Sequence, residues 1–382
     1  MLGVGACRIL RVVSYQNPIL MKQRHVGSAQ LVERTQGVKR REWSTADSNV
    51  YALETNSSRN SLKPYQVPDD PNYEPCVTFT PNQTERCQKP IGALLADLTA
   101  QSKFFYGIEI IPRLGGKPLP IDFNDFLPVL PTFVSVVWLA TQYWNIDPIE
   151  AVDTVQLVKH LEPRIPTLPH LTVYRMSEQR LDDFLALNLK NLLAVRGDKV
   201  HESQPYKDSE QLVRRAQCVR GESLSIGVAG YPEGYTNEPH GAENPLASVQ
   251  FLKQKVEAGA EFVIMQFCYR PEKIVQFILD CCAANINVPI IMGIVVPESF
   301  KTYLLMEKFV GVRLPNELRA RAEELQHCPA ELAKFFEELA LNNIQYVLDA
   351  NVGVCGVQFY TLNHLRSTIH ILKKLHEMEI LK

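Results

Sequence analysis

An apolar run that ends in Arg196-Gly197-Asp198 is the clearest candidate for chemistry in this chain. The run Asn191–Val195 has the composition of a buried strand, and the tripeptide after it presents two charges around a glycine. Glycine lets the backbone approach a ligand closely. Alone, the pattern is equally well explained by an ordinary strand followed by a polar turn. The ends of the other apolar runs decide between these two interpretations.

Those other runs also end in side chains that can bind ligands or transfer protons. Glu109 can serve as an acid, and the Gln266 amide can both donate and accept hydrogen bonds. The remaining run ends carry Arg113, Trp138, His170, Tyr231, Gly293 and Tyr360. Each residue taken singly is better explained as structural. As a set meeting on one face, they favour a functional site.

Strand-like and helix-like segments alternate from about residue 91 onward. Amphipathic helical patterns such as 148–162, 177–189 and 246–260 separate short apolar runs. The expected strands are 104–111, 133–140, 167–174, 191–197, 223–231, 261–269, 288–296 and 354–362. Eight βα units in strict alternation predict an α/β fold, a (β/α)8 TIM-type barrel whose site lies at the carboxyl ends of the strands. A doubly wound open sheet is the alternative, although no Gly-x-Gly-x-x-Gly opens a helix.

The segment before the barrel has a different composition. Residues 1–90 are interpreted as a largely disordered extension, and residues 91–382 as the catalytic barrel. The first 32 residues contain four basic and no acidic side chains. This composition is typical of a mitochondrial transit peptide, and a disordered cytosolic extension explains it equally well.

Overall composition argues against several classes of partner. With a net charge of −2, the chain shows no bias toward nucleic acids or membranes, and no apolar run is long enough to cross a bilayer. The nine cysteines form no CxxC pair and no zinc pattern. Cys268, Cys281 and Cys282 are interpreted as reduced core residues, which indicates an intracellular protein, cytoplasmic or mitochondrial.

Four segments together resemble methylenetetrahydrofolate reductase. They are Leu193–Asp198, Val228–Pro232, Phe251–Ala260 with Gln266, and Val357–Asn363, in the family's order and spacing. The resemblance covers about residues 100 to 376 and implies an FAD-containing barrel. It also implies that NADPH or NADH supplies a hydride, through FAD, to 5,10-methylenetetrahydrofolate, giving 5-methyltetrahydrofolate.

The resemblance implies roles for individual residues. Glu109 lies where the family places the general acid that opens the folate ring, and Asp198 where it places the aspartate near flavin and pterin. Gln266 and Tyr360 match substrate-binding positions, to which Asp198 also belongs. Flavin-binding positions are matched by Trp138, His170, Arg196, Gly197, Asp198, Tyr231 and Lys255.

The chain departs from the family pattern at several positions near the expected site. The first-strand motif is shortened to Glu109-Ile-Ile-Pro-Arg113. Val137 replaces a threonine, Ser248 an aspartate and Met292 a proline, and His364 replaces an arginine that would help to hold an anionic substrate tail. These differences concern ligand affinity more than the fold.

Three hypotheses follow. The first is an active, FAD-dependent reductase of one-carbon and methionine metabolism that acts on a small-molecule folate, and a homo-oligomer is expected with it. The second is a catalytically weak paralogue that keeps the barrel for binding or regulation, and the third is another flavin oxidoreductase on a related barrel. Eukaryotic members of the family that the chain resembles usually add a C-terminal domain that senses S-adenosylmethionine. Because the chain ends at Lys382, just after the expected eighth helix, we also expect no feedback inhibition by S-adenosylmethionine.

Overall fold

The structure is a computed structural model that describes residues 73–80, 89–114, 117–118, 120–199, 201–234 and 245–382. Most of the predicted disordered extension, and the 235–244 part of the loop after Tyr231, therefore lie outside the described residues. The boundary at residue 90 stays a prediction. From this segment Val77–Thr78 forms β1, which pairs with β5 (Ile121–Asp122).

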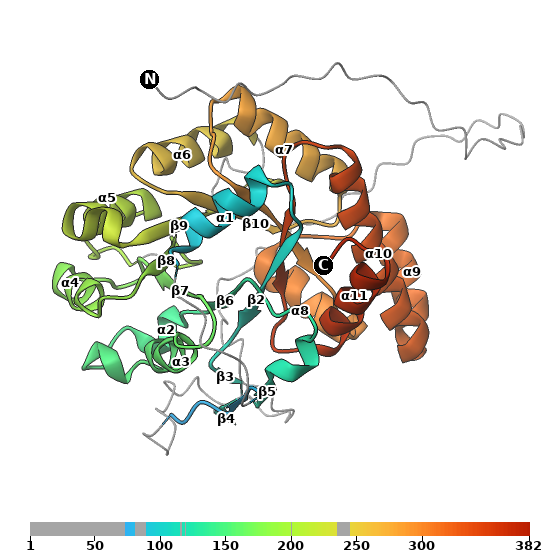
Figure 1. Ribbon diagram of the computed structural model, residues 1–382, viewed down its shortest axis with the longest axis horizontal. Coiled ribbons are helices and arrows are strands. Elements are labelled where there is room, and N and C mark those ends of the chain that lie inside the picture. Colours follow the sequence, from blue (N-terminus) through green and yellow to red (C-terminus); the bar gives the residue numbers. More distant parts are fainter. Residues whose placement is uncertain (1–72, 81–88, 115–116, 119, 200, 235–244) are drawn as a thin grey trace, which may run out of the picture. The chain divides into compact units, whose positions relative to one another are not determined.

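Eight parallel strands close into a barrel, as the sequence predicts (Figure 1). In the order in which they pair around the ring, with β12 pairing back to β2, they are β2 (Phe105–Ile110), β6 (Phe133–Val136), β7 (Thr167–Thr172), β8 (Asn191–Val195), β9 (Ser225–Gly230), β10 (Phe262–Phe267), β11 (Ile290–Val295) and β12 (Gly356–Tyr360). Each lies inside one of the eight predicted runs. Both faces of these strands are covered, which explains why their sequences are apolar almost throughout.

Helices cover the outside of the barrel, but their alternation with strands is less strict than predicted. They are α2 (Ala140–Tyr143), α3 (Asp153–Leu161), α4 (Glu178–Ala186), α5 (Ser209–Arg220), α6 (Pro245–Glu257), α7 (Pro271–Ala283), α8 (Phe300–Val310), α9 (Asn316–Glu324), α10 (Pro329–Asp349) and α11 (Arg366–Glu377). The first crossover carries the strands β3 (Arg113–Leu114), β4 (Lys117–Pro118) and β5, then a 3-10 helix, η1 (Phe123–Phe126), in place of an α-helix. The crossover from β11 to β12 carries α8, α9 and α10. Periodicity alone cannot distinguish such insertions from the repeated unit.

The amino end of the barrel is closed by α1 (Ile91–Ala100). Ile91 and Leu95 pack into the interior cluster with Phe105, Phe133 and Phe262 from the strands. No side chain of α1 itself caps its first turn; instead, Ile91 N–H donates to Asn191 Oδ1 (2.7 Å) and Gly92 N–H to Ser225 Oγ (2.9 Å). Because this end is plugged, a ligand must enter from the carboxyl ends of the strands.

Two further expectations concern burial and membranes. Cys268 and Cys281 are buried as predicted. Cys282, the next residue of α7 after Cys281, lies on the outer surface of the helix and is exposed. In the described part of the chain, no helix is both long and apolar enough to cross a bilayer.

Candidate functional site at the carboxyl end of the barrel

Side chains alternate along each strand, so residues two apart share a face. Phe105, Phe133 and Phe262 mark the interior face. Counting forward in steps of two from interior residues of the same strands places four predicted site residues in the barrel mouth. They are Glu109 on β2, His170 on β7, Gln266 on β10 and Tyr360 on β12. The tertiary structure thus brings together a carboxyl, an imidazole, an amide and a phenol.

Glu109 is the most strongly perturbed acid of this group. Its residue is 8% exposed, and burial raises the pKa of its carboxyl to about 8. The ordinary pKa of a glutamate is near 4.5. Because the raised value lies above neutral pH, Glu109 carries a proton at neutral pH. A protonated carboxyl facing the barrel mouth is suited to general acid catalysis.

Tyr360 stands beside Glu109 on the neighbouring strand. Its hydroxyl donates to Met265 O (2.9 Å), and its ring packs edge-on against Phe267, 5.7 Å between centroids. Burial, and then the charges of Glu109 and Tyr231, raise the pKa of Tyr360 well above its usual value. The phenol therefore remains neutral, and it contributes a fixed aromatic wall to the mouth.

The path of β10 is irregular where Gln266 faces the mouth. The pairing with β11 shifts register between Ile264 and Phe267, and Gln266 Oε1 accepts from Phe267 N–H (3.0 Å). This brings the backbone of β10 against Gly293, where an added Cβ would lie 2.3 Å from Met265 O. The glycine at position 293 is therefore required for the β10–β11 approach that presents the Gln266 amide.

His170 is a neutral imidazole with an unused nitrogen. Burial lowers the pKa of His170 to about 4, so the ring is uncharged at neutral pH. Within the described residues its enclosed Nε2 has no hydrogen-bond partner. Buried polar atoms without a partner are uncommon, so this nitrogen is available to a ligand or a water molecule.

The Arg196-Gly197-Asp198 turn follows β8 at the same end of the barrel. Gly197 has φ +79°, a conformation that favours glycine, and a Cβ there would lie 3.2 Å from Thr172. Asp198 is in contact with solvent, but partial burial by the surrounding protein raises its pKa. The positive charges of Arg196 and Lys199 act in the opposite direction and lower it. The turn presents a carboxylate that is only partly hydrated.

A second cation lies near this turn. Burial lowers the pKa of Lys255, on α6, to about 8; Asp208 raises it and Arg196 lowers it further. Lys255 and Arg196 therefore lie close enough to interact although both carry positive charge. Two neighbouring cations beside this turn favour an anionic group such as a phosphate.

Two predicted residues are not part of the mouth. Trp138 falls on the opposite parity to Ser135, and its ring packs edge-on against Tyr143 (5.6 Å) and Phe184 (6.0 Å) in the helical layer. Arg113 is buried and forms an ion pair with Asp153, 2.7 Å from Nε to Oδ2. This ion pair attaches the first crossover to α3, which explains why an arginine follows β2.

Sequence reasoning assigned no role to the residues that hold Glu109 in place. Thr361 Oγ1 donates to Glu109 O (2.6 Å), and the Asn363 side chain binds the backbone of Ile111. Gln358 and Ser135, bonded to each other at 2.8 Å, lie in the interior below the acid. For Gln358 and Ser135, a polar residue at an interior position of an apolar strand was the available signal.

The departures from the family pattern have different surroundings. Val137 is partly buried, and its carbonyl accepts from Thr154 Oγ1 (2.6 Å), whereas Met292 is fully buried in β11. Ser248 is half-buried on α6. His364 Nδ1 lies 3.8 Å from Glu298 Oε2. A carboxylate beside His364 makes this position less favourable for an anionic substrate tail than an arginine would be.

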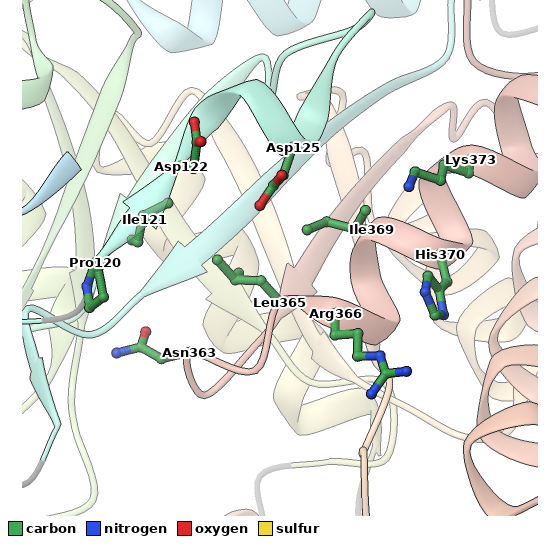
Figure 2. A pocket seen from close by; sticks show the side chains of 10 residues that line it. All are labelled: Pro120, Ile121, Asp122, Asp125, Asn363, Leu365, Arg366, Ile369, His370 and Lys373. Atoms are coloured by element: carbon green, nitrogen blue, oxygen red, sulfur yellow. The ribbon is translucent and has the colours of Figure 1, made fainter. Parts of the chain in front are cut away.

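A separate pocket of about 400 Å³ lies between η1 and α11 (Figure 2). Asp122 and Asp125 line one side of it, and Arg366, His370 and Lys373 project from α11 on the other. None of these residues is among the polar groups of the mouth. No group of three or more metal-binding side chains occurs in the part of the chain described by the structure.

The chain is similar in sequence to several known proteins. The family model described as methylenetetrahydrofolate reductase matches residues 95–376. Methylenetetrahydrofolate reductase (NADH) 1 of Arabidopsis thaliana is 29% identical over 74% of this chain and 50% of its own length. Methylenetetrahydrofolate reductase 2 of Schizosaccharomyces pombe is 31% identical over 73% of this chain and 46% of its own length. The chain spans about half the length of these relatives.

A bacterial relative is shorter. The 5,10-methylenetetrahydrofolate reductase of Pectobacterium carotovorum is 26% identical over 75% of this chain and 92% of its own length. Among solved structures, an uncharacterized protein from Clostridium thermocellum that binds two copies of 5-methyl-5,6,7,8-tetrahydrofolic acid has a TM-score of 0.51 at 16% identity. It covers 74% of this chain and 99% of its own length, and it supports the fold.

Proposed function

The chain belongs to the methylenetetrahydrofolate reductase family, and on that premise we propose that it reduces 5,10-methylenetetrahydrofolate to 5-methyltetrahydrofolate with NADPH or NADH as reductant. The observation that carries the proposal is Glu109, a buried carboxyl that keeps its proton at neutral pH in the barrel mouth. Two relatives with related names support the reaction class, and the folate-binding neighbour supports a folate ligand.

Glu109 performs the proton transfer in this proposal. Its carboxyl gives a proton to a ring nitrogen of the bound folate, and the C–N bond of the five-membered ring breaks to leave an iminium cation. The Asp198 carboxylate lies at the same end of the barrel and stabilises that positive charge. A hydride then reduces the iminium carbon to the methyl group, and Glu109 is left ionised until it regains a proton.

Several residues of the mouth fit FAD. The unused Nε2 of His170 offers a hydrogen bond, Gly197 permits close backbone approach, and Arg196 with Lys255 supplies positive charge for a pyrophosphate. When bound there, FAD would supply hydride transfer between the nicotinamide and the folate. Tyr231, partly exposed after β9, completes this side of the proposed flavin site. The Trp138 ring packs against Phe184 in the helical layer.

Folate recognition is assigned to the opposite side of the mouth. The Gln266 amide can donate and accept toward a pterin edge, and the Tyr360 ring supplies an aromatic surface. Both face the interior next to Glu109, so a folate whose pterin they bind could present the leaving nitrogen of its five-membered ring to the acid.

The test is an absorption spectrum of purified protein reconstituted with FAD. We expect a flavin band that NADPH or NADH bleaches and methylenetetrahydrofolate restores. Glu109→Gln should keep bleaching by the nicotinamide and lose restoration by folate, because only the second half-reaction needs the proton. Protein that binds no FAD, or a Glu109→Gln variant with undiminished folate turnover, would contradict the proposal.

A second candidate is a family member with weakened folate reduction. The proximity of Glu298 to His364 favours it, since a carboxylate there opposes an anionic tail. It predicts nicotinamide-dependent bleaching with slow restoration by folate, rescued in part by Glu298→Gln. Fast restoration by the unmodified protein excludes it.

A further inference from the structure

Gln358 crosses the interior of the barrel directly below the mouth. It lies on β12, in register with Gly107 of β2, and its Nε2 donates to Ser135 Oγ on β6 (2.8 Å). The side chain therefore spans β2, which it can do because position 107 has no side chain. A Cβ on Gly107 would lie 2.6 Å from Gln358 Oε1. The amide oxygen is thus fixed over the backbone of β2.

That oxygen is buried without a donor. Gln358 is 1% exposed, and within the described residues its Oε1 has no hydrogen-bond partner. Tyr360 does not supply the donor, because its hydroxyl donates to Met265 O. Ser135 Oγ, which accepts from Gln358, lies 3.4 Å from Ile108 O. An unsatisfied buried acceptor is costly, so a further donor is expected nearby.

Glu109 is the side chain placed to supply it. Glu109 follows Gly107 by two residues on the same interior face of β2, and it is the register partner of Ser135. The amide of Gln358, held between Gly107 and Ser135, therefore lies one interior layer below the acid. A carboxylic acid has one O–H donor, whereas a carboxylate has none.

We propose that Gln358 is a positioning residue whose Oε1 accepts a hydrogen bond from the carboxylic acid form of Glu109. This rests on the proposed role of Glu109 as the acid and deepens it. The bond favours the protonated form and fixes the direction of its O–H before substrate arrives. An amide does not exchange protons in this pH range, so Glu109 regains its proton from the open mouth and not from the interior.

The bond to Ser135 determines which end of the amide faces Glu109. With Nε2 fixed on Ser135 Oγ, the carbonyl oxygen is the end left for the acid. In the reverse orientation an N–H would point at Glu109 and favour the carboxylate. The sign of the effect on Glu109 therefore distinguishes the two orientations.

Infrared difference spectroscopy of the ligand-free protein between pH 5 and 10 tests the proposal, with Glu109→Gln assigning the acid C=O band. In Gln358→Met, which lacks the acceptor at similar length, we expect the band to move to the position of an acid whose O–H is unbound. In Ser135→Ala the amide is free to turn its N–H to Glu109, so the band should titrate lower by about one pH unit.

An unchanged band position in Gln358→Met overturns the proposal, as does an unchanged or raised titration in Ser135→Ala. The proposal is also overturned if the unmodified protein shows no acid C=O band that disappears in Glu109→Gln. Ser135→Ala is a small change that keeps the test available if Gln358→Met does not fold. The measurement needs no turnover, so failure of folate reduction would count against the proposed function and leave this result intact.

Discussion

The side-chain amide of Asn363 binds both backbone groups of Ile111, a residue 252 positions earlier in the chain. Ile111 N–H donates to Asn363 Oδ1, and Asn363 Nδ2 donates to Ile111 O, each at 2.8 Å. Thr361 adds a bond to Glu109 O (2.6 Å). The chain leaving β12 thereby holds the chain leaving β2, two residues beyond the proposed acid.

Removal of this amide should destabilise the barrel. Asn363→Ala leaves the N–H and C=O of Ile111 without partners in a buried position, so we expect a loss of about 2–4 kcal/mol in the free energy of unfolding. Urea denaturation measures it. Asn285→Ala is the matched control, because exposed Asn285 has nearly the same backbone conformation, φ 61° against 62°. Equal losses in the two variants would show that the Ile111 bonds contribute nothing.

Stability should depend on the protonation of Glu109. Its pKa is about 8 in the folded protein and near 4.5 unfolded, so the folded state holds the extra proton between these values. Stability of the unmodified protein therefore falls as pH rises through this window, by up to about 1.4 kcal/mol per unit. Glu109→Gln lacks the titration, and its stability advantage should grow from pH 5 to pH 8. Urea unfolding at several pH values measures it, and a constant difference would refute the raised pKa.

The ion pair between Arg113 and Asp153 should matter more than a similar pair on the surface. Their side chains are 7% and 13% exposed, so Arg113→Leu leaves a largely buried carboxylate and should cost about 3–5 kcal/mol. Arg215 and Asp182 are 2.6 Å apart but 39% and 38% exposed. Arg215→Leu should cost far less, because solvent screens an exposed pair. Thermal unfolding compares the two, and similar losses would contradict the role given to burial.

Lys255 should be unfavourable for the ligand-free fold and favourable for ligand binding. Its pKa is about 8 in the folded protein and near 10.5 unfolded, so the buried charge costs stability at pH 7, and this cost disappears as pH rises from 8 to 10.5. Lys255→Met should raise stability at pH 7 by about 1–3 kcal/mol. If the proposed flavin site is right, the same variant should bind FAD more weakly.

Lys253→Met provides the comparison for both measurements. Lys253 lies on the same helix, is 42% exposed and forms a 3.9 Å ion pair with Glu257. We expect it to change neither the unfolding free energy nor the FAD titration appreciably. Equal effects at positions 253 and 255 would argue against a buried cation at the mouth.

The fold was predictable because its signal is local. Each strand is a short apolar run, because both faces of a parallel sheet are covered and each strand must therefore be apolar on both sides. The polar residues that interrupt or end these runs, Glu109 and Gln266 among them, were visible for the same reason. The insertions were not, because α9 and α10 have the same periodicity as the helices of the repeating unit.

The amino-acid sequence by itself determined the eight strands, their order along the chain and the candidates at their ends. Only the tertiary structure decided which candidates face the mouth, because a shift of one residue reverses the side of the strand. Glu109 faces inward, whereas Trp138 packs against Phe184 outside. Only closure of the barrel set Gln358 below Glu109 and Asn363 against Ile111, since contacts between its first and last strands have no local trace in sequence.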